Sequence, residues 1–188
     1  MMRTILHTAV AAVCLCLMLC FTACRPYNTP HVNQALDTLL TSGRVESYGA
    51  FYAPEGVNYP VFSLDLYGQG VGLNEKGSIE GKGTNLYLSD IFVPEGQTSL
   101  IEGTYRCDTV AKEFAFLRGM NYDGNYGGSY VLLIGETSYT VYLIRSAEMQ
   151  LSYIGDTMLL DGQAVLENKK VYPFHFKGVL PVVKRERD

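Results

Sequence analysis

The strongest constraint on the fold is an alternation of apolar and polar side chains that recurs in short segments after residue 44. In residues 61–67, Phe62, Leu64 and Leu66 fall on one face and polar side chains fall on the other. Successive side chains of a strand point to opposite faces of a sheet, so this period is typical of half-buried antiparallel strands. The same alternation occurs in two further segments, residues 85–90 and 138–144.

Turn signals rich in glycine separate the alternating segments, which favours a β-sandwich or a β-barrel. The signals are Gly68-Gln69-Gly70, Asn74–Gly77, Pro94-Glu95-Gly96, Gly127-Gly128, Gly155-Asp156 and Asp161-Gly162. Before, between and after the last two turn signals, the sequence predicts strands over residues 148–154, 157–160, 164–166 and 172–180. Pro173 indicates a sheet edge or a strand start there. The predicted fold is all-β, an antiparallel β-barrel or β-sandwich.

One short N-terminal helix is a further expectation. Apolar residues recur at helical spacing from Val32 through Ala35 and Leu36 to Leu39-Leu40, and Gly43 follows as a candidate C-cap. A first strand in the same region is the alternative.

The N-terminus has the features of an export signal. Arg3 precedes an apolar run over residues 9–19, and the segment ends in Phe21-Thr22-Ala23-Cys24. A basic start, a short apolar run and small residues at the end are typical of a secretory signal peptide. The run is shorter than the roughly 20 apolar residues that span a bilayer. A cysteine at this point resembles the lipobox of bacterial lipoproteins, so we expect lipid attachment at Cys24.

These features predict three parts: a lipoprotein signal peptide over residues 1–23, a tether over 24–31 and a single β-domain over 32–188. Four of the five cysteines lie in or at the end of the signal, which leaves Cys107 alone in the domain. An acylated Cys24 offers Cys107 no disulfide partner, so the class of disulfide-stapled domains is excluded. We expect Cys107 to be a buried small apolar residue.

The charge of the chain gives no sign of a nucleic-acid partner. Residues 1–23 contain Arg3 and no acidic residue, so their removal lowers the 15 Lys and Arg to 14, against 19 Asp and Glu. Nucleic-acid binding domains carry a basic patch or stripe. The basic cluster at residues 184–188 also contains acidic residues and lies at a terminus, which indicates a solvated end.

The sequence offers no cofactor or metal site. It lacks the Gly-x-Ser-x-Gly elbow, the His-Glu-x-x-His pair, the phosphate-binding glycine loop and the Cys-x-x-Cys pair. After the signal, only His31 and His175 remain, which is too few for a zinc site. His175 lies between two phenylalanines of a predicted strand, so we expect it to face away from the core.

The segment from Asn121 to Gly128 is the best candidate for ligand or partner contact. Asn121, Asp123 and Asn125 alternate like calcium ligands, but glycine stands at the seventh position and no acid at the twelfth, so a turn is favoured over a calcium loop. Tyrosine on a loop gives a rigid amphipathic contact surface for a glycan or a protein. Structural tyrosines of a sheet are the competing interpretation. The candidate contact residues are Tyr122, Asp123, Asn125, Tyr126 and Tyr130.

Several motifs together resemble a family of uncharacterised exported lipoproteins of Bacteroidales. The motifs are the lipobox, with Phe21 in place of the usual leucine, Phe62–Tyr67, Leu86–Leu88, Val93-Pro94, Leu100–Tyr105, Met149–Leu151, Gly155–Thr157, Asp161–Gln163 and Phe176–Gly178. The resemblance implies an antiparallel barrel or sandwich, calycin-like in places, at the outer membrane. The acidic run that follows the lipidated cysteine in surface-exported members is absent, so both the periplasmic and the outer face stay open.

Three functions follow from these observations. The first is a non-catalytic, lipid-anchored binding or assembly module of the cell envelope, which presents loops to a glycan, a small ligand or a partner protein. The alternative is an envelope or polysaccharide hydrolase that uses strand carboxylates such as Asp65 or Asp90 as acid and base; it requires two carboxylates in one cleft. The third is a structural envelope lipoprotein.

Overall fold

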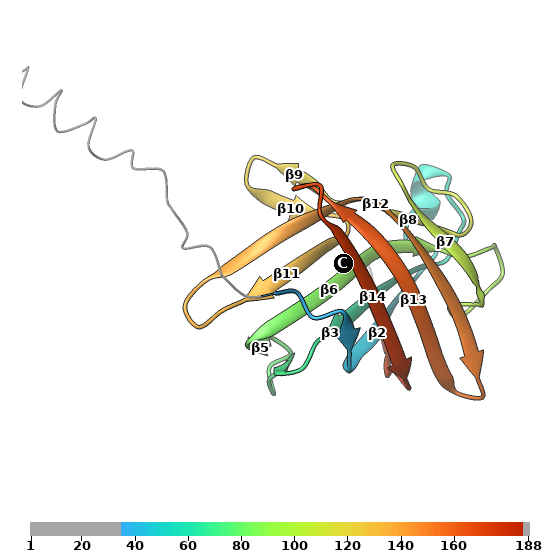
Figure 1. Ribbon diagram of the computed structural model, residues 1–188. Helices are drawn as coiled ribbons and strands as arrows, with labels where there is room; N and C mark the ends of the chain where they lie inside the picture. Colours follow the sequence, from blue (N-terminus) through green and yellow to red (C-terminus); the bar gives the residue numbers. More distant parts are fainter. Residues whose placement is uncertain (1–34, 186–188) are drawn as a thin grey trace, which may run out of the picture. The chain divides into compact units, whose positions relative to one another are not determined.

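The computed structural model of the protein describes residues 35–185, and these fold as an all-β domain (Figure 1), which confirms the predicted fold class. None of the helices among these residues has the length and apolarity needed to cross a membrane. The elements are β1 (Leu39–Leu40), β2 (Ser42–Gly49), the 3-10 helix η1 (Ala53–Glu55), β3 (Val61–Tyr67), β4 (Val71–Leu73), β5 (Ile79–Gly81), β6 (Gly83–Phe92), β7 (Gly103–Asp108), β8 (Ala115–Leu117), β9 (Met120–Tyr122), β10 (Asn125–Gly127), β11 (Tyr130–Ile134), β12 (Tyr139–Ile154), β13 (Thr157–Leu166), β14 (Val171–Gly178) and β15 (Val182–Lys184).

The main sheet closes on itself through its first and last strands. Only Thr41 separates β1 from β2, and β15 continues the course of β14 after residues 179–181. β1 pairs with β14 and β2 pairs with β15, both in parallel. The other neighbours around the ring, β2–β3–β6–β11–β12–β13–β14, pair antiparallel. With β1–β2 and β14–β15 counted once each, the ring has an odd number of strands, and an odd antiparallel ring needs one parallel pair to close.

A second, smaller ring closes within the same sheet. Strand β11 is short and fills only one half of the gap between β6 and β12. In the other half, β12 pairs with β7, β7 pairs with β8 in parallel, and β8 meets β6 at Phe92↔Ala115. Two hairpins, β4–β5 and β9–β10, stand outside the main sheet. The barrel wall is therefore continuous from β3 to β13.

The inside of the barrel is filled with apolar side chains. On β14, Tyr172, Phe174 and Phe176 are buried while the residues between them are exposed. The same two-residue period on the other strands directs leucines, valines and aromatic rings into one cluster. Burial of this cluster is the main source of stability, because each large apolar side chain gains about 1.5–3 kcal/mol when it leaves water.

The predicted turn at Asp161-Gly162 is wrong. Both residues lie inside β13, which pairs with β12 and β14 along its whole length. A Cβ at Gly162 would overlap the ring of Phe174, so glycine is present here because an aromatic ring covers the strand. The predicted strands 138–144 and 148–154 likewise belong to one strand, β12, which bends at a bulge between Ile144 and Ser146.

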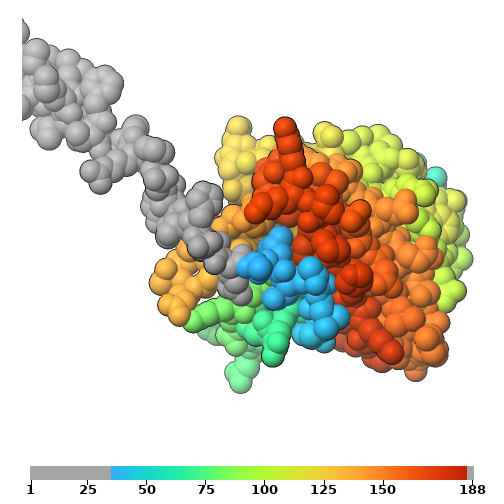
Figure 2. Space-filling model, in the orientation of Figure 1, coloured from blue at the N-terminus to red at the C-terminus, as the bar shows by residue number. Residues whose placement is uncertain are grey.

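The expected N-terminal helix is also wrong within the described residues; Val32 lies outside them. Leu39 and Leu40 form β1, where Leu40 is buried in the core and Leu39 is exposed. Gly43 lies inside β2 and is no helix C-cap, because a Cβ there would overlap the main chain at Asp65 of β3. Pairing with β14 therefore decided the conformation of residues whose spacing fits a helix equally well. In the space-filling view these N-terminal residues, in blue, lie against the last strands, in red (Figure 2).

Replacement of Gly43 tests this close approach of β2 and β3. We expect Gly43→Ala to destabilise the domain by about 2 kcal/mol, because the added methyl group must push the Asp65 main chain away. Gly72→Ala is the matched control, since a Cβ there meets nothing within 4 Å. Urea unfolding followed by circular dichroism measures both. Equal midpoints for the two variants would contradict the close approach.

Candidate functional site

The barrel wall is open beside the last strand. β13 pairs with β14 up to Met158↔Gly178 and begins at Thr157. β14 and its continuation β15 run past this point, and in the part of the chain that the structure describes, β15 pairs with β2 alone. The side of β15 that faces away from β2 is therefore a free strand edge at one end of the barrel.

An apolar pocket of about 130 Å³ lies at this opening, and we call it the mouth pocket. The side chains in its wall that carry a polar group are those of Thr98, Ser99, Tyr153 and Asp156. The remaining lining is aliphatic or aromatic and comes from both sides of the opening: Val45, Phe62, Leu100, Met158, Leu180 and Val182. The pocket thus ends where the packed core of the barrel begins.

The surface around the mouth pocket is apolar with an acidic margin. Val179 and Val182 are 68% and 62% exposed, although valine is usually buried. A wider depression of about 620 Å³ adjoins the pocket and includes Glu102 and Asp156 in its wall. Exposed apolar side chains gathered around a pocket are typical of an interaction site.

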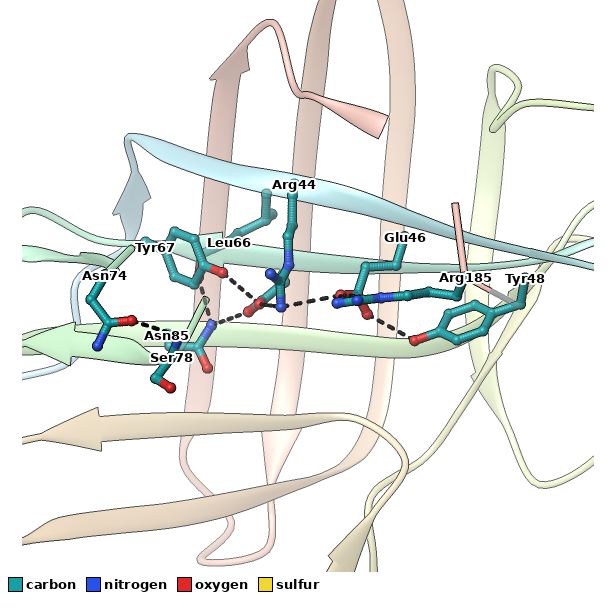
Figure 3. A network of polar contacts seen from close by, with 10 residues as sticks. Arg44, Glu46, Tyr48, Leu66, Tyr67, Asn74, Ser78, Asn85 and Arg185 are labelled. Carbon is teal, nitrogen blue, oxygen red and sulfur yellow. Dashed lines mark hydrogen bonds and ion pairs between the residues drawn. The ribbon is translucent and has the colours of Figure 1, made fainter. Parts of the chain in front are cut away.

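A second cluster lies on the outer face of β2, β3 and β6, and we call it the outer-face network (Figure 3). Arg44 joins two carboxylates, since its Nη2 lies 3.1 Å from Glu46 Oε1 and 3.2 Å from Asp65 Oδ2. Asn85 donates to Asp65 Oδ1 over 2.6 Å, and the Tyr67 hydroxyl donates to Asp65 Oδ2. The remaining members, Tyr48 and Arg185, both bond to Glu46.

Burial shifts the pKa values of the two carboxylates in this network. Glu46 and Asp65 are 4% and 3% exposed, so the expectation that the polar face of β3 is half exposed is wrong. Burial alone would raise the pKa of Glu46, but hydrogen bonds from Arg185 and Tyr48 and the charge of Arg44 lower it below its usual value. Burial raises the pKa of Asp65 in spite of hydrogen bonds from Tyr67 and Asn85.

Some polar atoms at the network have no partner. Arg44 Nε, Ser63 Oγ and Asn85 Oδ1 are buried without a hydrogen bond among the described residues. The oxygens of both carboxylates are engaged, those of Glu46 by Arg44, Arg185 and Tyr48. A substrate would have to replace one of these bonds to reach either carboxylate. The network therefore links the neighbouring strands β2, β3 and β6 by side-chain bonds.

The predicted contact segment forms a tight hairpin, β9–β10. Asp123 and Gly124 have positive φ angles of 50° and 91°, as a two-residue hairpin turn requires. Tyr122 and Tyr126 are both exposed, but Tyr122 pairs with Asn125, which places the two tyrosines on opposite faces of the ribbon. They do not form one aromatic platform.

Tyr130 lies apart from the other predicted contact residues. It begins β11 and pairs with Tyr87 of β6, and the two rings lie 5.3 Å apart beside the outer-face network. Burial raises the pKa of Tyr130 to about 12, with a further contribution from nearby Tyr87 and Asp65. Tyr130 is thus half-buried on the barrel wall, as the structural interpretation of the tyrosines expects.

The other sequence candidates lie in separate surroundings. Asp90 has a positive φ and accepts a hydrogen bond from Tyr52, and burial raises its pKa. Cys107 is a free thiol packed against the core, where burial raises its pKa to about 11. His175 faces away from the core as expected, with Nδ1 2.6 Å from Asp161 Oδ1. Cys24 lies outside the described residues.

Across residues 35–185 the structure brings together no group of three His, Cys, Asp or Glu side chains that could hold a metal ion. The sequence pointed to Asp65 as a strand carboxylate, but it showed no sign of the arginines that contact Glu46 and Asp65. It showed no sign of the mouth pocket either. Glu46 and Asp65 face the same way on adjacent strands, and that register is visible only once β2 and β3 are paired.

Comparison with known proteins adds no relative. No protein-family model matches the chain, and neither a curated protein nor a solved structure does so.

A pH series on Glu46→Gln tests the outer-face network. Because folding lowers the pKa of Glu46, its ionised form stabilises the domain above the unfolded pKa, near 4.5, and this contribution disappears as the pH falls through the folded pKa. We expect the variant to lose about 2 kcal/mol at neutral pH and to approach the wild-type stability in acid. Urea unfolding at several pH values measures the difference.

Glu136→Gln is the control, because Glu136 forms an exposed ion pair with Lys82. Its unfolding midpoint should stay near that of the wild type at every pH. A constant gap between wild type and Glu46→Gln across the whole pH range would contradict the assigned charge of Glu46.

Proposed function

We propose that this protein is a lipid-anchored, non-catalytic binding module of the cell envelope, which takes an apolar group of its ligand or partner into the mouth pocket. The observation that supports this proposal is the mouth pocket itself. It is an apolar hollow of about 130 Å³ with the exposed Val182 in its wall and the exposed Val179 in the wall of the depression beside it. Such a surface is costly to leave in water unless something covers it.

The volume of the pocket limits what it can hold. An engineered apolar cavity of about 150 Å³ binds benzene, so the mouth pocket suits one group of that size. The rest of the barrel interior is occupied by core side chains such as Leu64, Leu88 and Phe174. This packing disfavours carriage of a whole ligand inside the barrel. It favours a ligand that inserts a single side chain or the end of an acyl chain.

The pocket lies at the opposite end of the domain from the point where the chain enters. Asp37 contacts Thr84, at the start of β6, whereas Phe62 at the start of β3 lines the pocket. Figure 1 shows the first described residues near β5 and β11, away from the turn between β12 and β13. An anchor attached through the tether would leave the pocket open to a partner.

The anchor is part of the same proposal. The signal-like residues 1–23 and the cysteine that follows them support processing at Cys24. One acyl chain binds a membrane only marginally, whereas two or more hold a protein stably, and a diacylglyceryl cysteine supplies two. The tether, residues 24–31, then separates the barrel from the lipid surface. The outer membrane is the membrane that the lipoprotein resemblance favours.

The alternative of an envelope hydrolase has weaker support. Its best acid–base pair is Glu46 and Asp65, whose pKa values are shifted in opposite directions. Both carboxylates contact Arg44 and are buried, and hydrogen bonds occupy their oxygens. Asp90 bonds to Tyr52 in another part of the barrel. A substrate would have to break the outer-face network to reach these groups.

Mass spectrometry of the mature protein tests the anchor. The full chain, made in a bacterium that processes lipoproteins, should begin at Cys24 and carry a diacylglyceryl group there. Cys24→Ala should remain unprocessed, because the acylated sulfur is absent. A mature chain with an unmodified N-terminus at another residue would overturn the lipid anchor and leave the pocket proposal standing.

Toluene, a benzene-sized probe, tests the pocket. With methyl groups labelled for NMR, we expect toluene to shift the signal of Met158, which lines the pocket. Val182→Trp should abolish the shift by filling the pocket from its rim. Val171→Trp is the control, since Val171 is an exposed valine at the start of β14. The pocket proposal fails if toluene leaves Met158 unchanged or if Val182→Trp binds it like wild type.

A further inference from the structure

The free edge of β15 exposes main-chain groups that can pair with another strand. The Pro181 carbonyl accepts a hydrogen bond from Val45, and the Arg185 N–H donates to the Ser47 carbonyl. These groups point toward β2. Because main-chain groups alternate in direction along a strand, those of Val182 and Lys184 point the other way. No described strand lies on that side, so their N–H and C=O groups form an open edge.

This open edge runs directly beside the mouth pocket. Val182 pairs with Val45, and paired residues share a face of the sheet. Val45 is 4% exposed in the core, whereas Val182 is far more exposed, because the wall ends at this point. A strand added beside β15 would therefore cross the pocket, and its alternate side chains would point into it. Leu180, two residues before Val182, lines the same pocket.

Charge limits the chemistry of the added strand. No Lys, Arg or His belongs to the described residues that line the mouth pocket and its adjoining depression, whereas Glu102 and Asp156 do. Both acids are exposed, and although Glu102 Oε1 accepts a hydrogen bond from the Tyr153 N–H, both carboxylates face solvent where a cation can approach them. A basic residue beside the inserted apolar side chain would thus be attracted, and an acidic one repelled.

We propose that the mouth of the barrel binds an extended segment of a partner protein by strand addition to β15, with one aliphatic or aromatic side chain in the mouth pocket and a Lys or Arg next to it. This inference rests on the proposed function and names its ligand class. Main-chain hydrogen bonds to Val182 and Lys184 supply affinity, and the pocket supplies specificity.

A short peptide tests the proposal on the purified domain. The probe is fluorescein-labelled acetyl-Lys-Thr-Leu-Thr-Lys-amide, measured by fluorescence anisotropy. Peptides with Ser for Leu, with Asp for both Lys, or with alternate N-methylated amides should each bind about tenfold more weakly. N-methylation removes main-chain donors and leaves every side chain in place, so this loss is specific for strand addition.

Two variants at one position separate the strand edge from the side chain. Lys184→Pro removes the outward N–H and no hydrogen bond to β2, so the domain should keep its unfolding midpoint while peptide affinity falls about tenfold. Lys184→Ala is the matched control and should bind within about twofold of wild type. In hydrogen exchange, the Val182 and Lys184 amides should become protected when the peptide is added.

Each outcome decides a different step. Equal binding of the normal and N-methylated peptides, or of wild type and Lys184→Pro, would overturn strand addition. If no peptide binds while toluene still shifts Met158, the proposed pocket function stands and the peptide ligand is wrong. If toluene fails as well, both fail. Concentration-dependent dimerisation that the peptide does not reverse, with protection of the same two amides, would assign the edge to a second copy and overturn a partner peptide.

Discussion

Closure of the barrel by a parallel pair is the constraint on which the rest of the structure depends. Antiparallel neighbours alternate in direction, so a ring with an odd number of strands cannot close without one parallel seam. Here the seam joins β1–β2 to β14–β15. Pro181 lies within the seam and has no N–H to give, and the pairing is interrupted around it. After the interruption the chain runs on past the first residues of β13, and this leaves both the free edge and the mouth pocket.

The outer-face network holds this seam together from outside. Arg185 follows β15 and bonds to Glu46 of β2, which shares Arg44 with Asp65 of β3, and Asn85 of β6 completes the line. Four neighbouring segments are thus linked across the parallel pair. Buried ion pairs add little net stability compared with apolar packing, but removal of one partner leaves an uncompensated charge. The network therefore favours this one closed arrangement over any with the last strand detached.

The filled interior and the open mouth together define what kind of binding this domain supports. A calycin-like barrel carries its ligand within, but here aromatic rings such as Phe174 and Tyr105 occupy that space. Among the described residues, an apolar hollow lies at the end of the barrel, where a strand edge is free. A ligand bound at this place would lie on the protein surface and insert one side chain into the pocket. A partner that supplies both a strand and an anchor residue fits these two features at once.

The sequence by itself determined the all-β class, most strand positions, a turn within residues 121–128 and the outward direction of His175. These follow from local rules, namely a period of two and the backbone freedom of glycine. Local rules misled at Leu39-Leu40 and at Asp161-Gly162, where pairing with β14 and the ring of Phe174 overrode them. The parallel seam, the contact of Arg44 with two carboxylates and the mouth pocket were decided only by the tertiary structure. Each of them depends on which distant strands become neighbours and in which register. The spacing of residues along one strand does not indicate which other strand it pairs with.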